Sequence, residues 1–212
     1  MTSPTPLSTR VRAATASAHR AAETRGFITR LMDGEFDLAT YATYLTQYAH
    51  VYRAIESRTP QPDDPALIND PRLHRFPSIA SDLAGLGIHE WEATEPLKST
   101  LAYARHLDEL GDTDAPRYLA HHYTRYLGDL SGGQAIGALM ARHYGASPAQ
   151  LSFYRFEQID SAPRFKNAYR AALDSLDFTA AQEEDFIAES QFAFVLNGAI
   201  FDELGTTVPA TC

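Results

Sequence analysis

The chain has 212 residues, 44% of them hydrophobic, which suits one compact domain with a substantial core. Its formal net charge of −9 argues against broad binding to nucleic-acid backbones, which require a basic protein surface. The only cysteine is Cys212, so the sequence excludes a disulfide framework, a cysteine-based zinc site and an internal thiol nucleophile. We expect a cytoplasmic protein without a membrane anchor, because neither a membrane-length apolar run nor a secretory hydrophobic core is present.

The first predicted helix begins at Leu7 and contains His19. Its spacing predicts a buried face formed by Leu7, Val11, Ala14 and Ala18. An adjoining face carries Arg12, Thr15, His19 and Glu23. The alanines around His19 would let a large flat ligand approach, and Glu23, one turn away, could accept a hydrogen bond from a metal-bound imidazole. An ordinary surface histidine on an alanine-rich helix fits the same spacing.

The second long helix is predicted over residues 36–55. Its apolar face is formed by Tyr41, Tyr44, Leu45, Tyr48, Val51, Tyr52 and Ile55. Five prolines then lie within residues 60–77 and predict a long surface loop over residues 59–78. The block before this loop is too short to hold its own core, so we expect one all-helical domain.

The most informative segment is residues 121–134, with the sequence HHYTRYLGDLSGGQ. Its first half continues a predicted buried helical face made of Tyr118, Leu119, His122, Tyr123, Tyr126 and Leu127. Three glycines and Asp129 follow within six positions. A glycine inside a helix costs roughly 1 kcal/mol relative to alanine, so the cluster indicates a kink or a backbone lying close to something flat. Asp129 could hold ordered water near a metal-bound ligand, or could be an ordinary surface or capping residue.

The C-terminal third contains two capping boxes, which begin at Ser147 and Thr179. The second precedes a predicted apolar helix over residues 186–204. Between the boxes, Lys166 and Arg170 form an i, i+4 pair on a helix that also presents Tyr169. Two such cations can clamp a pair of carboxylates, although a solvated helix face is the simpler alternative.

In this order, the segments resemble the heme oxygenase family over about residues 7–204. The run YLGDLSGGQ at 126–134 is similar to the family's distal-helix signature, and TASAHRAAE at 15–23 is similar to its proximal segment. The resemblance implies an all-α, single-domain multi-helix fold over residues 1–212, with flexible ends at 1–6 and 206–212. Heme would be sandwiched between a proximal helix and a kinked distal helix.

The resemblance implies a role for each matching residue. His19 would be the axial iron ligand, and Glu23 would accept a hydrogen bond from its other ring nitrogen. The contacts to the heme propionates would come from Arg12, Lys166, Arg170 and Tyr123. The distal helix would bend over the heme at Gly128 and Gly132.

The remaining matches concern the distal side of the heme. Four polar residues match a distal water network, namely Tyr52, Arg125, Asp129 and Asn197. Two apolar residues match the pocket wall, namely Phe194 and Phe201.

The reaction implied by the resemblance uses heme b as both substrate and cofactor. Dioxygen and electrons convert it to biliverdin, carbon monoxide and ferrous iron, with cleavage expected at the α-meso carbon. The electron donor would be a ferredoxin with its reductase, or a flavoprotein reductase. Because the axial imidazole should stay neutral, we expect Glu23 to be off-line from His19 or screened by water.

Three alternatives share this architecture. A non-enzymatic heme-binding or heme-storage protein would keep His19 but would not need Gly128, Asp129 and Gly132 together. A thiaminase-like enzyme would need an internal cysteine. A di-iron carboxylate protein would need repeated Glu-x-x-His, which the sequence lacks.

Overall fold

The computed structural model describes residues 5–208, and every regular element in them is helical. The eight α-helices are α1 (Leu7–Glu23), α2 (Gly26–Met32), α3 (Leu38–Glu56), α4 (Phe76–Gly85), α5 (Lys98–Leu110), α6 (Ala115–Tyr144), α7 (Ala162–Asp174) and α8 (Ala180–Thr207). Four short 3-10 helices connect them, namely η1 (Pro71–Leu73), η2 (Trp91–Ala93), η3 (Pro148–Gln150) and η4 (Ser152–Tyr154). None of the described helices combines the length and apolar character that a membrane crossing requires.

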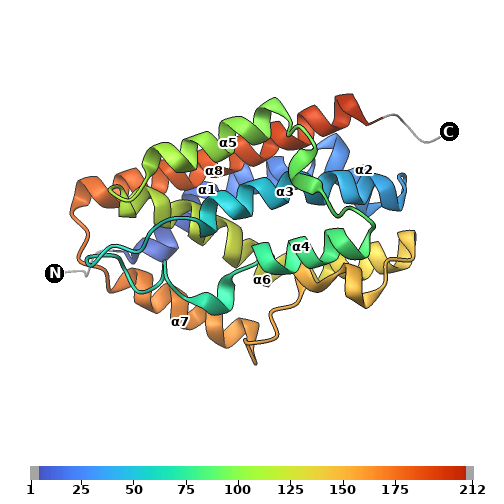
Figure 1. The fold of residues 1–212 in the computed structure, drawn as a ribbon. Coiled ribbons are helices and arrows are strands. Elements are labelled where there is room, and N and C mark those ends of the chain that lie inside the picture. The colour runs from blue at the N-terminus through green and yellow to red at the C-terminus, as the bar shows by residue number, and fades with distance from the viewer. Residues whose placement is uncertain (1–4, 209–212) are drawn as a thin grey trace.

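Helix α8 organises the fold. It packs along both α6 and α1 and also contacts α2 and α5, while α3 packs against α4 and α5. Helix α7 rests on α1 and α6. In Figure 1, α5 and α8 run along the top of the molecule and α7 crosses the bottom, with α1, α3 and α6 between them. The core is rich in aromatic rings, and six of them are fully buried: Tyr41, Tyr52, Tyr103, Tyr126, Phe153 and Phe186.

Side-chain caps determine where several helices begin. Asp37 accepts from the Thr40 backbone N–H at 2.7 Å and starts α3 two residues later than the periodicity predicted. Thr179 forms the predicted capping box at the start of α8. Helix α8 extends beyond the predicted range of 186–204 at both ends. Helix α6 ends at Tyr144 and is capped by Gly145, whose φ of 65° is a left-handed conformation that glycine adopts without strain.

Some sequence expectations were wrong in their boundaries. The capping box at Ser147 is present, but the helix that it starts is the three-residue η3. The proline-rich loop also ends earlier than predicted, because Pro77 lies in the first turn of α4. A proline is tolerated there because the backbone N–H groups of a first helical turn have no partner within the helix. Residues 206–207, expected to be flexible, are the last residues of α8, whereas 1–4 and 209–212 lie outside the described residues.

Helix α6 passes through its glycines without a break. Residues 115–144 are α-helical throughout, so the glycines do not end the helix, and the predicted kink stays a prediction. A Cβ added at Gly133 or Gly137 would come within 3.4 or 3.1 Å of the Tyr154 ring, so these two glycines allow η4 to pack closely on α6. Part of the glycine cluster therefore serves packing.

Candidate functional site

His19 and Glu23 form an exposed pair near the end of α1. The His19 Nδ1 atom lies 3.1 Å from Glu23 Oε2, with the two side chains 52% and 61% exposed. The imidazole meets the Phe194 ring of α8 edge-on, with 5.6 Å between ring centroids. Within the described chain, His19 Nε2 has no hydrogen-bond partner. Glu23 was expected to be off-line from His19 or screened by water. It is not off-line. Both side chains are more than half exposed, and screening by water stays a prediction.

The burial of α1 around His19 differs from the prediction at three positions. Thr15 is buried, and its hydroxyl donates to the Val11 carbonyl at 2.8 Å, which satisfies the hydroxyl inside the helix. Ala14 and Ala18, predicted to be buried, are half-exposed instead. Of the four residues predicted on the face that carries His19, Arg12, His19 and Glu23 are therefore exposed and Thr15 is not.

Cations from two helices approach Tyr123 of α6. Burial raises the pKa of the Tyr123 hydroxyl, whereas the positive charges of Arg170 and Arg12 act in the opposite direction. Lys166, one turn before Arg170 on α7, donates to Ser131 Oγ at 2.9 Å. Partial burial and the charge of Arg170 both lower the Lys166 pKa. In the described part of the chain none of these three cations forms an ion pair, so this region can accept an anionic group.

A buried polar network joins α3, α6 and α8. The Arg125 guanidinium donates to the Tyr52 hydroxyl at 3.0 and 3.2 Å and to Asn197 Oδ1 at 2.7 Å. The Tyr52 hydroxyl in turn donates to Asp129 Oδ2. Tyr48, which the sequence suggested only as a core residue, also donates to Asn197 Oδ1, at 2.9 Å. The four predicted polar residues therefore lie in one network, with Tyr48 as a fifth member.

Asp129 is the only carboxylate in this network. Burial raises the pKa of its carboxyl, while the charge of Arg125 and the hydrogen bond from Tyr52 act against this rise. Its second oxygen, Oδ1, makes no hydrogen bond to the described residues. The carboxyl is thus held by one oxygen and has the other available to water.

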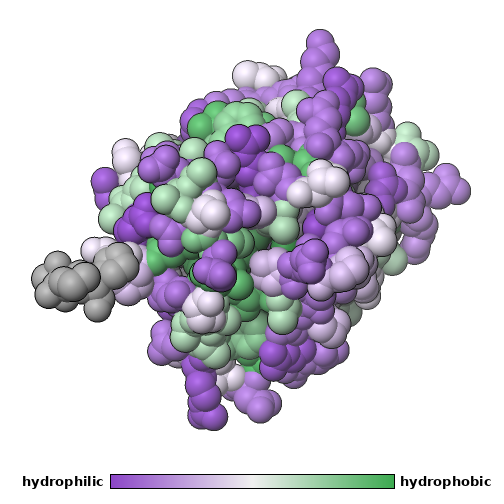
Figure 2. Space-filling view, turned by 90° about the vertical axis from the view of Figure 1, so that its left-hand side faces the viewer, coloured by the Kyte–Doolittle hydropathy of each residue, from purple (hydrophilic) through white to green (hydrophobic). Residues whose placement is uncertain are grey.

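The two glycines on either side of Asp129 differ from the packing glycines of the same helix. A Cβ added at Gly128 or Gly132 would meet no atom within 4 Å. These positions therefore border open space. Figure 2 shows apolar surface within a hollow on the face where α7 and the start of α1 lie.

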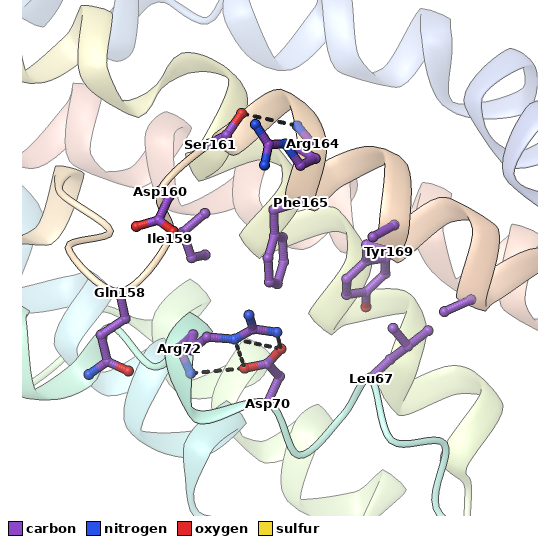
Figure 3. Close-up of a pocket in the computed structure, with 12 residues that line it drawn as sticks. Leu67, Asp70, Arg72, Gln158, Ile159, Asp160, Ser161, Arg164, Phe165 and Tyr169 are labelled. Atoms are coloured by element: carbon purple, nitrogen blue, oxygen red, sulfur yellow. Dashed lines mark hydrogen bonds and ion pairs between the residues drawn. The ribbon is translucent and has the colours of Figure 1, made fainter.

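A separate cavity of about 410 Å³ lies beside α7. Its other walls are the segment around η1 and the loop that leads into α7. Phe165 and Tyr169 point into it from α7, and Asp70 and Arg72 lie opposite (Figure 3). None of the site residues predicted from the sequence lines this cavity.

The profile of the heme oxygenase family matches residues 5–203. The chain belongs to the heme oxygenase family. It is 32% identical to heme oxygenase from Porphyra purpurea, covering 95% of this chain and 88% of that protein. It is also 32% identical to human heme oxygenase 1, covering 95% and 72% of the two chains.

Solved structures of heme oxygenases share the fold. Heme oxygenase-1 from the cyanobacterium Synechocystis, determined in complex with heme, superposes with a TM-score of 0.89 at 30% identity and covers 95% of this chain and 93% of that one. Heme oxygenase from Leptospira interrogans gives a TM-score of 0.88 at 34% identity, covering 94% and 100% of the two chains. The predicted all-α heme oxygenase fold is confirmed.

Most residues that the family resemblance selected lie in three groups, around His19, around Tyr123 and around Arg125. Phe201 is different. It is buried in the aromatic core, with its ring 6.3 Å from Tyr44 and 6.4 Å from Phe27. A place for Phe201 in the pocket wall stays a prediction.

Proposed function

We propose that this chain is a heme oxygenase that cleaves heme with dioxygen and electrons to biliverdin, carbon monoxide and ferrous iron. One observation carries the proposal: α1 presents an exposed imidazole with Nε2 unpartnered, and α6 presents two glycines that border open space. A histidine on one side and a stretch of backbone without side chains on the other suit a large flat ligand with a metal at its centre.

The residues present fit heme b. His19 Nε2 is available to ligate iron, Phe194 offers an apolar ring beside it, and Gly128 and Gly132 leave room for the macrocycle. Covalent attachment through two thioether bonds is excluded, because Cys212 is the only cysteine. Bound heme supplies both the iron that takes part in the oxygen chemistry and the ring that is cleaved.

Glu23 sets the tautomer of the proximal imidazole. When the Nδ1–H of His19 donates to Glu23 Oε2, the Nε2 lone pair faces away from the carboxylate and is available to a metal. Since both side chains are more than half exposed, water competes for the carboxylate. We infer that the oxygen chemistry requires an axial ligand without the negative charge that full proton transfer to Glu23 would give it.

Asp129 holds protons on the distal side. Tyr52 and Arg125 orient its carboxyl, and the free Oδ1 can hold a water that passes a proton toward the neighbouring open space. Burial raises the pKa of this carboxyl, so it holds a proton more readily than an exposed aspartate does. Gly128, the residue before Asp129, adds no side chain to the open space that it borders.

The cations near Tyr123 orient the substrate. Arg12, Lys166 and Arg170 can bind the two propionates and so fix the rotation of heme in its plane. We propose α-meso cleavage on this basis. The same positive rim could receive an acidic ferredoxin or a flavoprotein reductase, and this donor and a cytoplasmic location stay predictions.

The test is to add hemin to the purified protein and follow the visible spectrum after adding a reductant. A Soret band that forms and then gives way to biliverdin absorption supports the enzyme. A Soret band that persists would mean a heme-binding protein without this activity. The His19→Ala variant should lose tight binding and regain some of it with added imidazole. If it binds and degrades heme like the parent, the proposed ligand is wrong.

A further inference from the structure

Two histidines and a glutamate converge at a second place, where α5, α6 and α8 meet. His106 Nε2 lies 2.5 Å and His121 Nε2 lies 2.8 Å from the same oxygen, Glu189 Oε1. One ligand atom from each side chain falls within 4.8 Å of the others. His121 and Glu189 are buried, while the His106 side chain is 24% exposed.

These three side chains form a donor set for a divalent metal ion. Zinc is bound in proteins by imidazole nitrogens and carboxylate oxygens, and two histidines with one carboxylate leave a fourth position for water. His121 already has the arrangement typical of a metal ligand, because its Nδ1 lies 3.1 Å from the Tyr103 hydroxyl while Nε2 faces the cluster. A hydrogen bond at the remote nitrogen orients the ring and fixes its tautomer.

The distances suit an ion after a small adjustment. Ligand atoms about 2.1 Å from a tetrahedral zinc ion are separated by about 3.4 Å. The two nitrogens therefore need to move less than about 1 Å away from Glu189 Oε1. Partial exposure of His106 provides a route for the ion and for its water.

Two positive groups among the described residues act on the cluster. The charge of Arg125, one turn after His121 on α6, acts on His121. Arg117 Nε lies 3.9 Å from Glu189 Oε2, the carboxylate oxygen that points away from the histidines. Arg117 also pairs with Asp114 and Asp185, at 3.7 and 3.5 Å, which reduces its repulsion of a cation.

We propose that His106, His121 and Glu189 bind a divalent transition-metal ion of the zinc class. On binding, both Nε2 atoms give their lone pairs to the metal. Both protons shared with Glu189 must leave the Nε2 atoms: the His121 proton moves to Nδ1, where the Tyr103 hydroxyl accepts the hydrogen bond, or leaves to solvent, and the His106 proton moves to its own Nδ1 or leaves to solvent. No oxidation change is involved. The ion would join α5, α6 and α8, and His121 lies one turn before Arg125 on α6.

The test is binding of Zn²⁺ to the heme-free full-length chain in competition with a chromophoric chelator, supported by the visible spectrum of Co²⁺. We expect one tight equivalent and a thermal melting temperature that rises with Zn²⁺. His106→Ala and Glu189→Gln should each weaken binding by at least ~10-fold and remove the thermal shift. Because His106 is partly exposed, its variant should fold, which circular dichroism checks.

His19→Ala and His89→Ala serve as matched controls, since both remove an exposed histidine outside the cluster. They should keep the full equivalent of bound metal. The proposal is overturned if the parent shows no saturable binding. It is equally overturned if the His106→Ala variant binds as tightly as the parent, or if the His19→Ala variant is the one that loses the metal.

Discussion

The Tyr52 hydroxyl donates a hydrogen bond to Asp129 Oδ2 and so ties α3 to the glycine-rich part of α6. Tyr52 is fully buried and also accepts from the Arg125 guanidinium. One oxygen of the Asp129 carboxyl is therefore held by a buried hydroxyl that bulk water does not reach. Its remaining oxygen is the one that can act on a ligand.

Replacing Asp129 by alanine should leave heme binding nearly unchanged and slow biliverdin formation by about 10²-fold or more, because the proton donor is lost. Single-turnover measurements with a chemical reductant would separate the two effects. Asp108→Ala, an exposed change on α5, is the matched control. A normal rate of biliverdin release from Asp129→Ala would exclude the proposed role.

Adding a methyl group at Gly132 should have opposite effects on the ligand-free and the heme-bound protein. Gly132→Ala meets no neighbour and removes a helix-interior glycine, so thermal unfolding without heme should show a gain of about 0.5–1 kcal/mol. Heme affinity or turnover should fall, because the methyl group enters the open space. Gly137→Ala is the control: its methyl group would press on Tyr154 and should destabilise the protein. If Gly132→Ala left heme binding and turnover intact, Gly132 would not border the heme.

Removing the cations of α7 should change which carbon of heme is attacked. In a Lys166→Ala/Arg170→Ala double variant, the propionates lose two partners and heme can occupy more than one rotation in its plane. Chromatography of the biliverdin isomers should give mainly the α isomer from the parent and a mixture from the variant. A single α product from both proteins would show that other contacts orient the heme.

His122 should make the folded protein sensitive to acid. Burial, with a smaller effect from His74, lowers its pKa from 6.5 to about 3. The unfolded chain therefore binds a proton between pH 6.5 and 3 that the folded chain excludes. As the pH is lowered from 6.5 to 3, the free energy of unfolding should therefore decrease by about 1.4 kcal/mol per pH unit.

Urea unfolding at several pH values would measure this slope. The His122→Gln variant lacks the titrating group and should show a shallower dependence on pH in this range. An unchanged slope in the variant would assign the acid sensitivity to other groups.

Periodicity and capping residues were enough to predict the long helices. The buried positions of α3 and α6 were correct because aromatic residues recur every three or four positions, and Thr179 marked the start of α8. Thr15 was misplaced because a threonine counts as polar in a pattern, whereas in a helix its hydroxyl can bond the carbonyl one turn earlier. The short η3 shows that a capping box does not determine how far a helix extends.

The site was predictable only through the family resemblance. Tyr52, Arg125 and Asn197 belong to three helices, and no spacing within one helix brings them together. The histidine and glutamate cluster at α5, α6 and α8 has no sequence motif for the same reason. Tyr48 was overlooked as a hydrogen-bond donor, although the row of tyrosines on α3 was visible and buried tyrosine hydroxyls usually need a partner.

Phe194 and Asn197 stand three residues apart on α8, one touching the His19 ring and the other accepting from Arg125. A single helical turn thus underlies both halves of the site. If this turn slid along its axis or rotated, Phe194 would move relative to His19 and Asn197 would move relative to Arg125 at the same time. The surroundings of His19 and of Arg125 can therefore change only together.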